Sequence, residues 1–444
     1  MSVTELSEFP LTLFEKYFLL DASDEFPMLV DGVFHFSGRF KPEKFEEAVR
    51  ECLERQPLFL RKIERRKGDF FWVPCDGPFE IQWPDTPPDL NGVEWNEPID
   101  LFKRNGLDLY VYHQNEETKV YYRCHHICTD GAGFYRFIGE VLAAYAVKCG
   151  TTVKMFKPVV QERILDRADF KPGELPGKIG FWRIVYDTFR EIVRWLHEKP
   201  LFIGRRKNEV TGPRFGRKTY VIGSETVKRC RIGIRSAGCT LNDLLIAAFF
   251  ELLWKRETEQ NQRREQNRNR IRLMIPVNMR WPGSEDIPAA NMISYVFLTK
   301  KKADCDSNLL RVVHDEMQVI KNWQVGYIFL DALRFFDRVP GGLRMMTSGK
   351  KCLASMVFSN MGSVERCFGD TFPDTGPGIV DIGDLRLEYL ESFAPCRHLT
   401  NLSVAACFQS DRLVLCCEYD RVYLAEEELD TMFGVYEAIL EKFC

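Results

Sequence analysis

The sequence lacks any strong excess of charge of one sign. It contains 61 Lys and Arg residues against 64 Asp and Glu residues, which leaves a formal net charge of −3 over 444 residues. Such a chain has no broad positive field with which to hold phosphates, so we expect no nucleic acid partner. The basic residues between Arg263 and Arg272 are interspersed with Gln and Asn, a pattern more typical of a solvated loop than of a binding patch.

Metal-binding spacings and long hydrophobic runs are also missing. None of the 15 Cys residues forms a CxxC pair or has partners at the spacing of a zinc site, so no metal is predicted. We expect reduced, mostly buried thiols in a cytoplasmic protein. The longest uncharged apolar run of the central helices, Leu244–Phe250, is far too short to span a bilayer. The first residues carry acidic side chains and lack a basic start, so no secretory signal is expected.

The length of the chain suits two domains of about 200 residues each. Alternating strand and helix patterns predict a mixed α/β fold, and a similar inventory of elements follows a stretch rich in proline and glycine between residues 151 and 215. We therefore predict an N-terminal domain over residues 1–175, a linker over residues 176–215 and a C-terminal domain over residues 216–444.

The linker contains one predicted amphipathic helix, residues 181–197. Its apolar residues form one stripe, and its arginines lie elsewhere on the helix. One interpretation is a linker helix packed on the body of the protein. The other is a helix that lies on a membrane surface as a peripheral contact, which Trp182, Trp195 and the arginines favour.

Seven residues, His125-His126-Ile127-Cys128-Thr129-Asp130-Gly131, connect a predicted strand to a predicted helix. Residues 118–124 alternate between apolar and polar, and residues 132–145 carry apolar side chains at helical spacing. Adjacent histidines at the end of a strand point to opposite sides, so one can face a cleft while the other is held inside. Asp130 can cap the helix, and Gly131 lets the chain turn sharply.

This turn resembles the HHxxxDG motif of the chloramphenicol acetyltransferase-like superfamily. That superfamily includes condensation domains of peptide synthetases, wax-ester synthase/diacylglycerol acyltransferases and stand-alone polyketide-associated acyltransferases. Three further segments are similar to the wax-ester synthase branch. Cys239–Ala248 resembles its TxNDvllAA helix, Pro276–Arg280 followed by Asn291 resembles its PVxxR…GN segment, and Val357–Gly362 resembles its SNxpG or SNlG segment.

The resemblance covers nearly the whole chain, because residues 11–63 are also similar to the entrance of the superfamily. Two features depart from the pattern. Ala290 stands where the branch usually has Gly before Asn291, and little of the region between residues 60 and 105 resembles the pattern, so acceptor specificity does not transfer.

The resemblance implies an acyltransferase built from two chloramphenicol acetyltransferase-like domains, with mixed sheets and helices and an active site at the domain junction. Donor and acceptor would reach it from opposite sides. The donor is an acyl thioester, with acyl-CoA favoured over acyl-phosphopantetheine as co-substrate and no bound cofactor. The acceptor is a small-molecule alcohol or amine. Two alternatives stay open: a free-standing condensation domain served by a separate acyl carrier protein, and a catalytically silent binding member.

The same resemblance assigns the general base to His126, whose ordinary pKa of about 6.5 lies near working pH. His125 is expected to pack behind the turn. Asp130 is expected to hold the shape of the turn by pairing with Arg280.

The remaining predicted site residues are candidates to bind the oxyanion or substrate, or to act as a nucleophile. Gly131, through its backbone N–H, and Asn360, Ser359 and Asn291 are candidates for oxyanion or substrate contacts. Ser359 lacks a GxSxG elbow, and Cys128 shares the turn of His126 and would not align with it. Direct attack without an acyl-enzyme is therefore the simpler mechanism.

Overall fold

The structure is a computed structural model that describes residues 8–170, 199–206, 210, 212–260, 270–305, 307–348, 352–363, 368, 371–372 and 380–443. The predicted linker helix, residues 181–197, lies outside the described residues, as does most of the basic stretch between Arg263 and Arg272.

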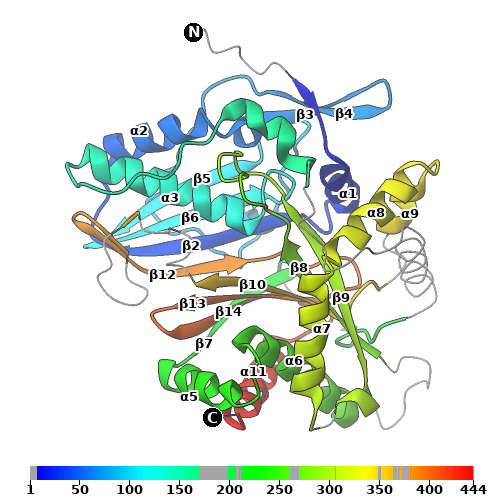
Figure 1. Ribbon diagram of the computed structural model, residues 1–444. Helices are drawn as coiled ribbons and strands as arrows, with labels where there is room; N and C mark the ends of the chain where they lie inside the picture. Colours follow the sequence, from blue (N-terminus) through cyan, green and yellow to red (C-terminus); the bar gives the residue numbers. More distant parts are fainter. Residues whose placement is uncertain are drawn as a thin grey trace.

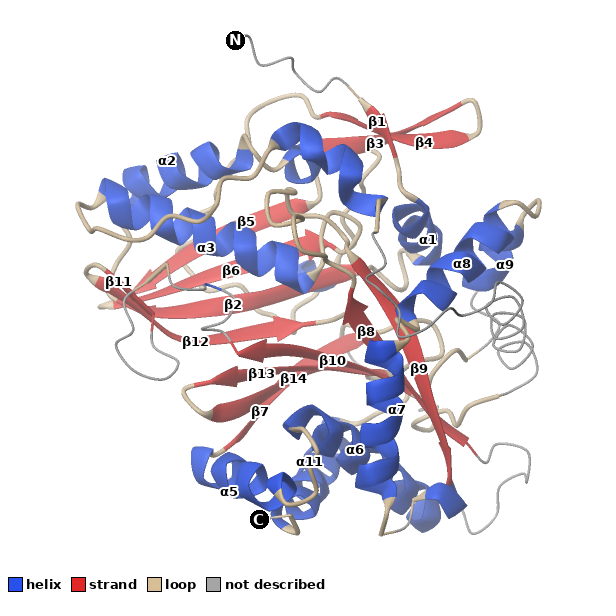
Figure 2. Ribbon diagram, viewed as in Figure 1, coloured by secondary structure: helices blue, strands red, loops and turns tan. Residues whose placement is uncertain are grey.

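A five-stranded antiparallel sheet forms the centre of the first lobe, in the order β11-β12-β2-β6-β5. Its strands are β2 (Leu29–Ser37), β5 (Leu107–Gln114), β6 (Glu117–His125), β11 (Val380–Ile382) and β12 (Leu385–Phe393). Helices α2 (Pro42–Leu53) and α3 (Gly131–Lys148) cover one face of this sheet (Figures 1 and 2). Strands β5 and β6 form an antiparallel hairpin, and Asn115 in its turn has a left-handed φ of 53°.

A smaller sheet and several short helices complete the first lobe. The sheet has the order β1-β4-β3, with β1 (Phe9–Pro10), β3 (Arg61–Arg66) and β4 (Asp69–Pro74). Helix α1 (Leu13–Asp21) follows β1 directly and begins with a capping box between Thr12 and Glu15. The 3-10 helices of this lobe are η1 (Pro57–Leu60), η2 (Glu94–Asn96) and η3 (Gln161–Ala168).

The second lobe is built on a six-stranded mixed sheet in the order β7-β14-β13-β10-β8-β9. These strands are β7 (Phe215–Ile222), β8 (Arg270–Asn278), β9 (Ile293–Lys301), β10 (Met356–Ser363), β13 (Leu402–Gln409) and β14 (Arg412–Asp420). Strand β10 runs parallel to both of its neighbours, and the other pairs are antiparallel.

Among the described residues, the helices of the second lobe are α5 (Ser224–Arg235), α6 (Leu241–Gln260), α7 (Leu309–Asn322), α8 (Gly326–Asp337), α9 (Gly342–Thr347) and α11 (Glu426–Glu441), with the 3-10 helix η4 (Lys302–Asp304). Helices α5, α6 and α11 pack beneath the sheet (Figure 1). Helix α6 begins with a reciprocal cap: the N–H of Thr240 donates to Asp243 Oδ2 at 2.8 Å, and the N–H of Asp243 donates to Thr240 Oγ1 at 3.3 Å.

The two lobes share structure at their junction. Residues 380–393 fall in the predicted C-terminal domain, yet β12 pairs with β2 in the first sheet and lies beside β13 and β14. One continuous buried cluster also contains residues of both lobes, such as Phe134, Ala290 and Leu330. The α/β architecture in two lobes is as predicted, and the packed junction places both lobes around the end of β6.

Candidate functional site

The seven-residue turn joins β6 to α3, as the sequence predicted. Strand β6 ends at His125, and α3 begins at Gly131 with Asp130 as its N-cap. The Asp130 carboxylate accepts a hydrogen bond of 2.8 Å from the N–H of Gly133. The N–H of His126 donates to the carbonyl of Met28 at 2.7 Å, so the turn is tied to the start of β2 as well.

His125 is enclosed in the interior of the first lobe. Only 5% of the residue is exposed, and its Nδ1 accepts a hydrogen bond of 3.3 Å from the N–H of Ile127. Burial, with a smaller contribution from the neighbouring His126, lowers the pKa of His125 to about 3. The ring is therefore neutral at ordinary pH and suited to packing, not to proton transfer.

His126 is half-buried, and a backbone hydrogen bond fixes its tautomer. Its Nδ1 lies 3.0 Å from the carbonyl oxygen of Thr129. A carbonyl oxygen only accepts hydrogen bonds, so Nδ1 carries the proton and Nε2 keeps its lone pair. Burial lowers the pKa of His126 below its ordinary value, although the Asp130 carboxylate opposes this shift. The imidazole is thus held neutral at pH 7, with Nε2 ready to accept a proton.

Asp130 and Arg280 form a bidentate ion pair between the two lobes. Both N–O distances are 2.9 Å, and the two side chains are 4% and 23% exposed. The N–H of Met292 donates to the same carboxylate at 2.8 Å, and Arg280 also donates to the carbonyl of Ala290 at 3.2 Å. The carboxylate therefore ties the start of α3 to the segment that connects β8 and β9.

Asn291 holds the backbone of the turn from the other lobe. Its side-chain Nδ2 donates to the carbonyls of His126 and Ile127, the second at 3.0 Å. Both amide hydrogens are used in this way, so Asn291 has no side-chain donor left for an oxyanion. The structure places this side chain against the turn, and its predicted contact with substrate stays a prediction.

The end of β10 lies directly against the turn. A Cβ atom on Gly131 would come within 2.1 Å of Met361 Cε, so a larger residue here would require the end of the Met361 side chain to shift. Asn360 is engaged locally, because its Nδ2 donates to Asn242 Oδ1 and its Oδ1 accepts from the N–H of Gly362, both at 2.9 Å. Ser359 Oγ lies 3.6 Å from Met361 Sδ. These residues are brought to the site, and their contact with an oxyanion stays a prediction.

Among the described residues, no group of three or more His, Cys, Asp or Glu side chains is placed to hold a metal ion. No helix in the described ranges is long and apolar enough to cross a membrane.

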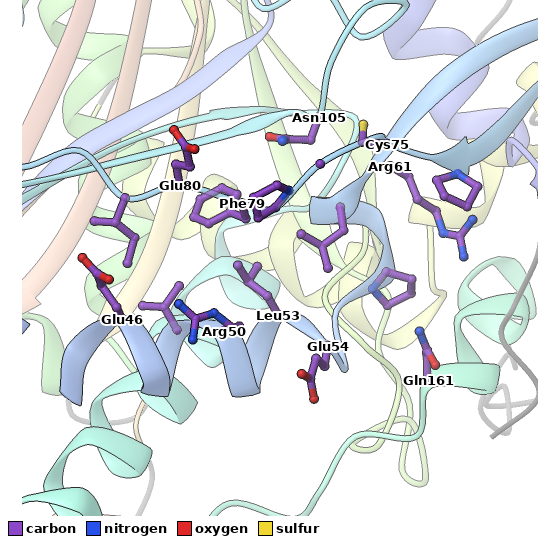
Figure 3. Close-up of a pocket in the computed structure, with 17 residues that line it drawn as sticks. Glu46, Arg50, Leu53, Glu54, Arg61, Cys75, Phe79, Glu80, Asn105 and Gln161 are labelled. Carbon is purple, nitrogen blue, oxygen red and sulfur yellow. The ribbon is translucent and has the colours of Figure 1, made fainter. Parts of the chain in front are cut away.

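A cavity of about 890 Å³ lies in the first lobe (Figure 3). It is bordered by α2, by η1 and by the chain that follows β4, with Leu53 and Phe79 facing each other across it. His126 and the other predicted site residues are not part of its lining. A passage to His126 between the lobes therefore stays a prediction.

No protein-family model matches the chain, and no curated protein matches it. Solved structures match over almost its whole length. SgcC5 from Streptomyces globisporus, in complex with (R)-(-)-1-(2-naphthyl)-1,2-ethanediol, is 14% identical, with 98% of each chain covered and a TM-score of 0.69. A mutant of the starter condensation domain of rhizomide synthetase, in complex with C8-CoA and Leu-SNAC, is also 14% identical, with coverage of 98% and 94% and a TM-score of 0.69.

A third similar structure is the epimerization domain from the third module of tyrocidine synthetase B. It is 12% identical, covers 98% of this chain and 97% of its own, and has a TM-score of 0.64. The chain therefore has the two-lobed fold of condensation domains, as the HHxxxDG resemblance implied. Likeness at these identities shows the fold, and the same fold also serves domains named for epimerization, so function rests on the site itself.

Proposed function

We propose that the protein is an acyltransferase that moves an acyl group from a thioester to a hydroxyl or amine, with His126 as the general base. The observation that carries the proposal is the hydrogen bond of the Nδ1 atom of this residue, from which its tautomer follows. Its Nδ1 is bonded to the carbonyl of Thr129, so Nε2 offers its lone pair at the junction of the two lobes. A neutral imidazole with a fixed free nitrogen is what a hydroxyl or amine needs in order to lose its proton during attack.

The reaction proceeds by direct attack. Nε2 of His126 takes the proton from the attacking alcohol or amine while the oxygen or nitrogen of that acceptor forms a bond to the thioester carbonyl carbon. The tetrahedral intermediate then collapses, the C–S bond breaks, and the imidazolium returns the proton to the leaving thiolate. No acyl-enzyme is formed, and neither Ser359 nor Cys128 acts as a nucleophile.

The residues around His126 have separate roles in this proposal. Asp130, Arg280 and Asn291 hold the turn in shape through the contacts described above. The developing oxyanion is met by the backbone N–H of Gly131, at the positive end of the helix dipole of α3, and by the amide of Asn360. Asn360 would have to exchange its bond with Asn242 to reach the oxyanion.

Acyl-CoA is the favoured donor. A similar solved structure, the starter condensation domain of rhizomide synthetase, was determined with C8-CoA, and three segments of this chain resemble the wax-ester synthase branch, which uses acyl-CoA. The alternative is a condensation domain that receives its acyl group from a carrier protein, and the likeness to a condensation domain of rhizomide synthetase supports it.

The experiment supplies the protein with acyl-CoA of graded chain length in one arm and with acyl-phosphopantetheinyl carrier protein in the other. Each arm contains a panel of small alcohols and amines, and chromatography measures free thiol and acylated product. Product from acyl-CoA supports the favoured donor, and product from the carrier alone supports the condensation alternative. No product in either arm contradicts both and favours the silent binding member.

A further inference from the structure

On helix α1, the side chain of Phe18 packs against the imidazole of His126. The ring centroids are 4.6 Å apart, and the planes are tilted by only 23°, so the two rings are stacked. Phe18 is fully buried. One face of the imidazole is therefore covered by an apolar surface and closed to water.

Two buried ion pairs hold α1 near its two ends. In its first turn, Glu15 accepts from Arg167 at 2.6 and 2.9 Å and from the indole N–H of Trp72 at 3.0 Å. At its last residue, Asp21 accepts from Nε of Arg397 at 2.7 Å. Both arginine side chains are almost entirely enclosed, at 3% and 6% exposed. Loss of either partner would leave a buried charge, so these pairs fix the helix in place.

Aromatic rings from both lobes also hold the Phe18 ring. Phe14, one turn earlier on α1, meets it edge to face at 4.9 Å. Tyr295 of β9 meets it edge to face at 6.4 Å, and Phe329 of α8 packs on Tyr295 at 5.4 Å. Phe18 therefore cannot turn away from the imidazole without disturbing the packing at the junction of the lobes.

The stacking affects the orientation of His126, because one hydrogen bond alone does not fix the plane of an imidazole ring. The bond from Nδ1 to the carbonyl of Thr129 anchors one edge of the imidazole, but χ2 of histidine has a broad energy profile, so the ring can rock about that edge. A flat partner 4.6 Å away removes this freedom. Nε2, on the far side of the ring, then points in one direction.

We propose that Phe18 is a positioning residue for His126: it sets the plane of the imidazole and keeps water from one of its faces. When the imidazole of His126 accepts a proton, it becomes an imidazolium that lies over the aromatic face of Phe18. A cation is stabilised in this position by the aromatic ring. The effect of Phe18 on the acyl transfer rate rests on the proposed function, whereas its effect on the titration and ring orientation of His126 does not.

A purely structural role makes a different prediction. If Phe18 served only as a core residue, its loss would lower stability and leave the titration of His126 unchanged. The matched control is Phe34→Leu, because Phe34 is also a fully buried aromatic residue of the first lobe and packs on Tyr122 and Tyr135, not on His126.

The test uses the full-length protein with isotope-labelled histidine rings, without substrate, and follows each ring by NMR as pH changes. His126→Gln assigns the signal. Burial lowers the pKa of His126, so Phe18→Ala, which admits water, should raise the titration midpoint toward 6.5. Phe18→Leu keeps the site apolar, so it should leave the midpoint near that of the wild type but broaden the ring signal through rocking. Phe34→Leu should change neither.

A midpoint and line width for His126 that match the wild type in Phe18→Leu and Phe18→Ala would overturn the proposal. If Phe18→Ala does not fold, Phe18→Leu decides alone through the line width. Where an acyl transfer rate is measurable, Phe18→Leu should lower kcat on the order of ten- to a hundred-fold with KM little changed. Absence of any such rate would contradict the proposed function, while the NMR result would still decide the role of Phe18.

Discussion

Replacing Asp130 with Asn tests how the turn is held. The carboxylate accepts four hydrogen bonds, two from Arg280 and one each from the N–H groups of Gly133 and Met292. An Asn side chain offers one oxygen and turns an N–H₂ group toward these donors, so at least one donor loses its acceptor. Arg280 also loses its opposite charge. Because removal of one partner from a buried ion pair costs about 3–5 kcal/mol, we expect the free energy of unfolding to fall by that amount.

Urea unfolding at pH 7, followed by tryptophan fluorescence and by circular dichroism, measures this change. The matched variants are Arg280→Met and the double variant Asp130→Asn with Arg280→Met. If the charges are coupled as described, the double variant should be destabilised by less than the sum of the two single variants. A decrease of less than about 1 kcal/mol in the free energy of unfolding of Asp130→Asn would show that the ion pair does not hold the turn, since solvent-exposed ion pairs contribute about that much to stability.

Two further predictions concern neighbours of His126. His125 has a folded pKa of about 3 because of burial, whereas its unfolded pKa is about 6.5, so its contribution to stability is complete above pH 6.5 and falls as pH decreases toward 3. Between pH 7 and pH 5, the free energy of unfolding should therefore fall by about 2 kcal/mol less in His125→Gln than in the wild type. Equal decreases in the two proteins, measured by urea unfolding at both pH values, would refute this. Asn291→Ala removes the donor to the carbonyls of His126 and Ile127 and should cost about 1–3 kcal/mol, with unchanged unfolding as the contrary result.

The local part of the site could be predicted from sequence because it depends on neighbours along the chain. Strand alternation and helical spacing located the turn between β6 and α3, and Asp130 at the start of the helix is its N-cap. The same holds for the cap of α6, where Thr240 and Asp243 stand three residues apart. The pair between Asp130 and Arg280 came from the family resemblance, since no local pattern connects residues 150 positions apart.

The other contacts across the lobes could not be predicted, because a sequence pattern does not specify which partner a side chain or strand will meet. The alternation in residues 385–393 indicates a strand but does not say that β12 pairs with β2 of the other lobe. Likewise, no local pattern shows that the amide of Asn291 bonds to the turn or that the amide of Asn360 bonds to Asn242, and the contacts of both residues with substrate stay predictions. Phe18 was missed, although the capping box of Thr12 and Glu15 marks the start of α1 in the sequence.

The role of His126 is tested most directly by the rate of thioester consumption in the wild type, in His126→Ala and in the control His398→Ala, which alters an exposed histidine. Acceptor and donor are those found active in the donor experiment, and circular dichroism confirms that each variant is folded. Loss of a general base should lower the rate by about 10²–10⁴-fold in His126→Ala, with the rate of His398→Ala unchanged. A folded His126→Ala protein that transfers acyl groups at the wild-type rate would contradict the account.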